Sequence, residues 1–62
     1  MYVQVRLLQH HKELVCWIPV DKRVKLGVRI TLKGLDGWWN VDKMYSITDS
    51  KPHQDWKVGG LI

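Results

Sequence analysis

The sequence predicts an all-β fold, formed as a single small domain over residues 1–62. Eight valines, four isoleucines and two threonines give the chain fourteen β-branched residues, and it contains neither alanine nor phenylalanine. Such stiff side chains favour strands over helices. Apolar and polar residues also alternate over several stretches. So few residues can bury these apolar faces only as a small barrel or two packed sheets, and we expect a five-stranded barrel.

Two strands are expected before Pro19. Apolar and polar side chains alternate over residues 2–8, which is the period of a strand with one buried face. Residues 9–13 form a polar break of hairpin-loop length. Residues 14–18 then predict a mostly buried second strand that ends at Pro19, because proline cannot donate to the ladder.

The strongest alternation covers residues 23–33. Every even position is apolar and every odd position is polar, except for Gly27. On a helix these residues would form no apolar stripe, so the pattern predicts extended chain. Gly27 is expected to mark a bend or bulge that leads into a strand over residues 28–33.

A tight turn and another strand follow. Residues 33–37 carry two glycines and an aspartate, which favours a hairpin turn. Alternation over residues 38–46 then predicts a strand with Trp39 and Tyr45 on one side and Trp38 on the other, and the pattern favours Trp39 as the inward tryptophan.

The end of the chain predicts a loop and a short last strand. Residues 48–55 are polar and include a proline, so we expect a loop. Residues 56–58 are expected to form the fifth strand, and Leu61 and Ile62 to dock on the core.

The segment from Val24 to Leu32, the glycine-containing turn and the Trp38-Trp39-Asn40-Val41 stretch together resemble a Src-homology-type (SH3-like) small β-barrel. The resemblance covers residues 24–46. In peptide-binding members the first of the paired tryptophans lines a groove for proline-rich segments, which would place Trp38 at a ligand site. This chain departs from those members in its first strand and in the basic, histidine-bearing residues 9–13, where they carry an acidic loop. The compact chain also looks like a stand-alone protein of the bacteriophage type.

The residues favour a protein without catalytic activity, metal or cofactor. Cys16 lies in an apolar strand pattern, which favours a buried structural thiol over a reactive one. His10 and His11 would point to opposite faces of a strand, and His53 lies far away in another loop. No glycine-rich loop opens a helix to hold phosphate.

The chain is expected to work in the cytoplasm. A single cysteine cannot form an internal disulfide, which fits a reducing compartment. No apolar run approaches the roughly 18 residues of a membrane span, and the first residues do not have the pattern of a signal peptide.

The residues favour a binding function over a catalytic one, and nucleic acid is the favoured partner. The net charge is +4, and the alternation places several cations on the face opposite the core, where they could follow a phosphate backbone. Lysines on a strand edge can equally serve to prevent sheet-to-sheet association. Four tryptophans exceed what so small a core can bury, so Trp38 or Trp56 is expected to be exposed and able to stack on a nucleobase. The predicted binding residues are Arg23, Lys25, Arg29, Lys33, Trp38 and Tyr45.

Two alternatives remain open from the sequence. The chain could be a protein-protein interaction module, such as an adaptor, a phage virion component or an inhibitor of a host protein, which would dock through Trp38 and Tyr45. It could also be a self-associating structural protein.

Overall fold

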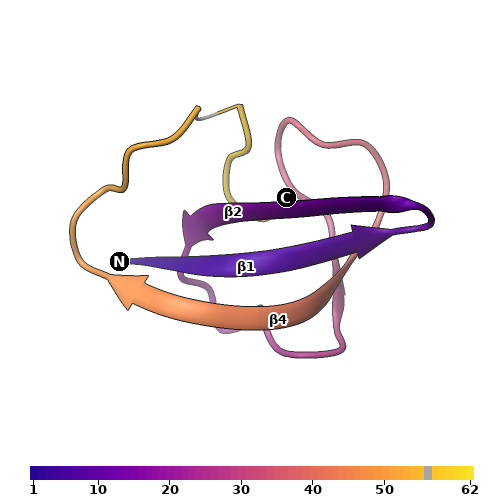
Figure 1. Ribbon diagram of the computed structural model, residues 1–62, viewed down its shortest axis with the longest axis horizontal. Helices are drawn as coiled ribbons and strands as arrows, with labels where there is room; N and C mark the ends of the chain where they lie inside the picture. Colours follow the sequence, from indigo (N-terminus) through magenta and orange to yellow (C-terminus); the bar gives the residue numbers. More distant parts are fainter. Residues whose placement is uncertain (56) are drawn as a thin grey trace.

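The computed structural model describes residues 1–55 and 57–62 and shows one curled antiparallel sheet, in the form of a half-barrel (Figure 1). In the described part of the chain the sheet has four strands in the order β2-β1-β4-β3. Their bounds are β1 Tyr2–Gln9, β2 Lys12–Pro19, β3 Arg29–Ile30 and β4 Trp39–Thr48.

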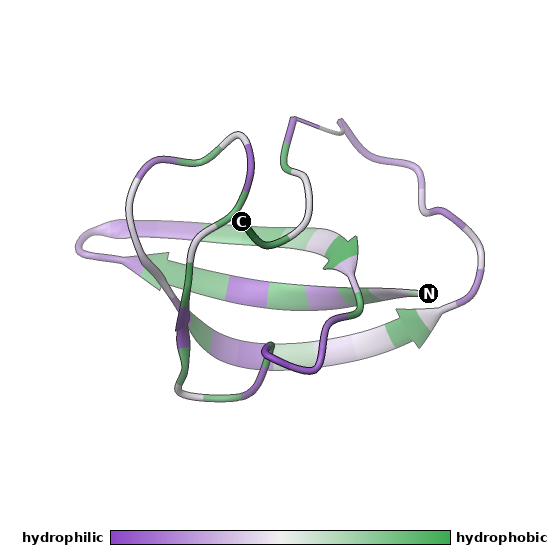
Figure 2. Ribbon diagram, turned by 180° about the vertical axis from the view of Figure 1, so that it is seen from behind, coloured by the Kyte–Doolittle hydropathy of each residue, from purple (hydrophilic) through white to green (hydrophobic). Residues whose placement is uncertain are grey.

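The core lies on one side of the three long strands, which we call the inner face. In Figure 1 these strands are nearest the viewer, and the segment that leads to β3 and on to β4 lies behind them with the end of the chain. Seen from behind, these segments cross in front of the sheet (Figure 2). The buried apolar residues are Val3, Val5, Leu7, Cys16, Ile18, Val24, Ile30, Leu32, Trp39, Val41 and Val58.

The first hairpin is tighter than the sequence predicts. Gln9 pairs with Lys12, so His10 and His11 alone form the turn in place of a five-residue break. His10 has a φ of 49°, a left-handed conformation that histidine adopts more readily than most residues.

The second strand alternates in burial and is not mostly buried. Cys16 pairs with Val5 on the inner face, whereas Val15 and Trp17 pair with Arg6 and Gln4. Because paired residues share a face of the sheet, Val15 and Trp17 lie on the opposite, outer face. Val15 is accordingly 46% exposed.

The expected extended chain over residues 23–33 is wrong for its first half. The Val24 amide bonds to the Asp21 carbonyl at 3.0 Å and the Val28 amide to the Lys25 carbonyl at 3.2 Å, both of which are turn contacts. Gly27 has a φ of 82°, and this confirms the predicted bend. The strand β3 is therefore only two residues long.

The inward side of β4 changes along the strand because its pairing with β1 contains register shifts. Leu7 pairs with Val41, but beyond the first shift Val5 pairs with Met44. Trp39 is 6% exposed, which confirms the inward tryptophan, whereas Tyr45 is 49% exposed. The prediction that Tyr45 shares the core side with Trp39 is wrong, because an extra residue in a bulge reverses the alternation.

The expected fifth strand is not formed in the described residues. Of its predicted residues 56–58, Trp56 lies outside the described residues, and Lys57 and Val58 are not in a strand. A single bridge instead joins Leu61 to Leu32. Leu61 packs against the core as predicted, but Ile62 is 71% exposed.

Candidate functional site

The pairing of β3 with β4 turns Trp38 away from the core. Ile30 pairs with Trp39, and both side chains are buried. Their sequence neighbours must point to the other side of this strand pair, since successive side chains alternate. Arg29 and Trp38 follow this rule, and the Trp38 side chain is 61% exposed.

A hollow of about 310 Å³ opens beside these two residues. We call it the Trp38 hollow. Among the described residues that line it, two are cationic and none is an aspartate or a glutamate. The end of the chain forms part of the wall, because the Ile62 amide bonds to the Thr31 carbonyl at 3.1 Å. The lining residues are Arg23, Val28, Arg29, Ile30, Thr31, Trp38, Leu61 and Ile62.

Arg23 is held by a carboxylate of its own loop. Its Nε and Nη2 atoms bond to the two carboxylate oxygens of Asp21 at 3.0 and 2.8 Å, and its backbone amide bonds to Asp21 Oδ1 at 2.9 Å. These bonds lower the pKa of Asp21 to about 2 and raise the pKa of Arg23. The charge of Arg23 is therefore largely balanced within the loop.

Arg29 is the free cation of the hollow. No carboxylate in residues 1–55 or 57–62 forms an ion pair with it. It is exposed on the two-residue strand β3, so its position is set by backbone pairing with Asn40. Arg29 thus offers an uncompensated positive charge on the same hollow as the Trp38 indole.

Three of the six predicted binding residues share the hollow, and three do not line it. The turns before β3 break the expected strip of cations, because Lys25 lies in the bent part of the chain. Lys33 follows the bridge at Leu32 and bonds through its backbone to Gly59 and Gly60. Arg23, Arg29 and Trp38 line the hollow, whereas Lys25, Lys33 and Tyr45 do not.

The sequence reasoning missed the apolar wall of the hollow. Leu61 packs against the core as predicted, and it also lines the hollow together with Val28 and Ile62. Val28 is 38% exposed. The glycine bend at residue 27 was the available signal, because a bend frees the residues next to it from the strict alternation of a strand.

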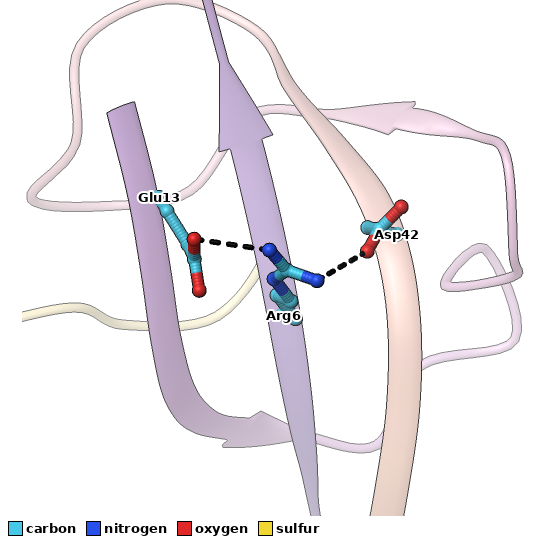
Figure 3. Close-up of polar contacts among 3 residues, drawn as sticks. All are labelled: Arg6, Glu13 and Asp42. Carbon is cyan, nitrogen blue, oxygen red and sulfur yellow. Dashed lines mark hydrogen bonds and ion pairs between the residues drawn. The ribbon is translucent and has the colours of Figure 1, made fainter. Parts of the chain in front are cut away.

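The outer face carries a separate charged cluster that the sequence reasoning also missed (Figure 3). Arg6 on β1 bonds to Glu13 on β2 at 3.0 Å and to Asp42 on β4 at 3.2 Å. The bond to Glu13 raises the pKa of Arg6, and Tyr45 contributes to the field around it. The cluster ties three strands together through one guanidinium and two carboxylates, so it is a structural feature.

The candidate catalytic groups are dispersed. Burial raises the pKa of the Cys16 thiol to about 11, which keeps it protonated at neutral pH. Among the described residues, no three histidine, cysteine, aspartate or glutamate side chains lie together in a group that could hold a metal ion. The described residues also include no helix of the length and hydropathy needed to span a membrane.

Comparison with family models, with curated proteins and with solved structures finds no match.

Proposed function

We propose that this chain is a small non-enzymatic protein that binds nucleic acid at the Trp38 hollow. The supporting observation is that Trp38, 61% exposed, lines one hollow with Arg29 and Arg23. An exposed indole can stack on a nucleobase, and an unpaired guanidinium can contact a phosphate. Among the described residues, no aspartate or glutamate side chain lines the hollow.

Within this proposal Arg29 and Trp38 have distinct roles. Arg29 contacts a phosphate, because it has no partner carboxylate among the described residues. Trp38 forms the stacking platform. Lys25 and Lys33 are exposed beyond the hollow and supply weaker contacts along the backbone of a longer oligonucleotide.

The proposed fold type is a Src-homology-type barrel. Its support is the curled sheet, the glycine turn before β4, and a tryptophan pair of which the first member is exposed and the second buried. The bacteriophage-type source and the cytoplasmic location stay predictions.

Titration of the protein into labelled single- and double-stranded oligonucleotides at several salt concentrations tests the function. We expect binding that weakens as salt rises, with a logarithmic slope that Arg29→Gln reduces by about one unit. Lys12→Gln is the matched control, because Lys12 lies at the turn of the first hairpin and does not line the hollow. Failure to bind either oligonucleotide at low salt would contradict the proposal.

A protein partner is the second candidate function. It is favoured by the apolar wall of the same hollow, where Ile62 is 71% and Val28 is 38% exposed. Binding to a protein should survive Arg29→Gln and be lost in Trp38→Ala, since tryptophan dominates many interfaces. Recovery of one stoichiometric protein from the native host after nuclease treatment would support this candidate.

A further inference from the structure

The size of the Trp38 hollow limits what it can hold. Its volume of about 310 Å³ lies at the lower end of the roughly 300–1,000 Å³ found for small-molecule pockets. A single planar group the size of a nucleobase suits such a space, whereas a double helix does not. A flat cationic surface would be enough to bind phosphates alone, so the hollow itself needs an explanation.

The lining of the hollow matches a base joined to a phosphate. The Trp38 indole is an aromatic surface, and Val28, Leu61 and Ile62 supply apolar contacts. Arg29 adds a free positive charge to the same lining. The hollow therefore combines an aromatic and apolar lining with a positive charge. A nucleotide has the matching groups, because its base has an aromatic face and is joined through the sugar to a phosphate.

Only an unpaired base can use this arrangement. In a duplex each base is stacked on both faces by its neighbours, so a protein side chain cannot reach a π-face without opening the helix. In a single strand the face of every base is available, and stacking on an aromatic side chain tolerates any sequence.

We propose that the Trp38 hollow takes one unpaired nucleobase of a single strand, stacked on the Trp38 indole, with an adjoining phosphate at Arg29. This inference rests on the proposed nucleic-acid function and specifies the substrate class of the same site. The protein therefore prefers single strands to duplexes and has little preference for base identity.

The test uses three labelled oligonucleotides of equal length at low salt. The first is a single strand, the second is the same strand in a duplex, and the third is a single strand whose sugars carry no bases. All three present phosphates, but only the first presents unpaired bases. We expect the first to bind roughly fivefold to 150-fold more tightly than the third, which is the contribution of stacking one base.

Variants of Trp38 test whether the indole causes the preference for unpaired bases. Trp38→Ala should bind the base-containing and base-free single strands alike, whereas Trp38→Phe should retain part of the preference because it keeps an aromatic face. Since Trp38 is 61% exposed, neither variant removes much buried surface, and unchanged thermal unfolding will confirm the fold.

The outcomes separate this inference from the proposed function. Equal binding of all three oligonucleotides would overturn the unpaired-base preference and leave the nucleic-acid function standing. Tighter binding of the duplex than of the single strand would likewise overturn the unpaired-base preference and leave the nucleic-acid function standing. Absence of binding to all three would overturn both.

Discussion

The side-chain amide of Gln54 bonds to both backbone groups of Trp17. Gln54 Nε2 donates to the Trp17 carbonyl at 2.8 Å, and Gln54 Oε1 accepts from the Trp17 amide at 2.9 Å. Trp17 lies on β2, which is the edge of the sheet. The amide thus occupies the position that a neighbouring strand would take beside β2. It also ties the loop after β4 to this edge strand.

Gln54→Ala should weaken the fold and open this edge. We expect a loss of about 1 kcal/mol in the free energy of unfolding, because two partly buried backbone groups lose their partners. Denaturant unfolding measures this loss, and sedimentation should show association that rises with concentration. His53→Ala, an exposed neighbour with no hydrogen bond to another described residue, is the control. Equal stability of the two variants would show that the amide pair does not form in solution.

Asp21→Asn should strengthen binding to nucleic acid. Asparagine keeps the Oδ1 acceptor for the Arg23 amide but no longer neutralises the Arg23 guanidinium. Arg23 then becomes a second free cation in the Trp38 hollow. The salt slope of oligonucleotide binding should steepen by up to about one unit. Asp55→Asn is the matched control, since Asp55 pairs with Lys57 and not with a residue of the hollow. An unchanged slope in Asp21→Asn would mean that Arg23 does not reach the strand.

The lowered pKa of Asp21 predicts part of the loss of stability at low pH. Its pKa in the folded protein is about 2, below the ordinary value of 3.8, because Arg23 bonds to the charged form. A lowered pKa contributes stability that is complete above the unfolded pKa and is lost as the pH falls toward 2. An NMR titration should place the midpoint of the Asp21 carboxyl near 2, and Arg23→Gln should move it up toward 3.8. A midpoint near 3.8 in the unsubstituted protein would contradict the ion pair.

Two glycines with positive φ should differ in their tolerance of alanine. Gly27 and Gly34 have φ values of 82° and 89°, so either substitution introduces backbone strain of about 1–2 kcal/mol. A methyl group at Gly27 meets open space, whereas at Gly34 it would overlap the carbonyl of Lys57. Gly34→Ala should therefore be the more destabilising in thermal unfolding. Equal losses would mean that the end of the chain does not pack against this turn.

The sequence was sufficient to predict the all-β fold because the alternation of β1 is simple. Val3, Val5 and Leu7 are each no more than 2% exposed, as the two-residue period requires. The turn before β4 also follows from composition, since Gly34 and Gly37 both have the positive φ that glycine permits.

The remaining features depend on contacts between distant segments. The apolar-polar alternation around Gly27 is compatible both with one long strand and with the turns that the chain forms. The pattern therefore does not distinguish these two structures. The bulges in β4 arise from pairing with β1, and they place Tyr45 away from the core side. Of the predicted cations, Arg23 and Arg29 reach the hollow because the turns bring them to Trp38, and no local pattern encodes that meeting.

An NMR titration of the isotope-labelled protein with a single-stranded oligonucleotide tests whether nucleic acid binds at the Trp38 hollow. We expect the largest shifts at the Trp38 indole and at the amides of Arg29 and Ile62, which share the hollow. Residues around Arg6 on the outer face should hardly move. Shifts confined to the outer face, or no shifts at all at low salt, would contradict the assignment of the Trp38 hollow as the binding site.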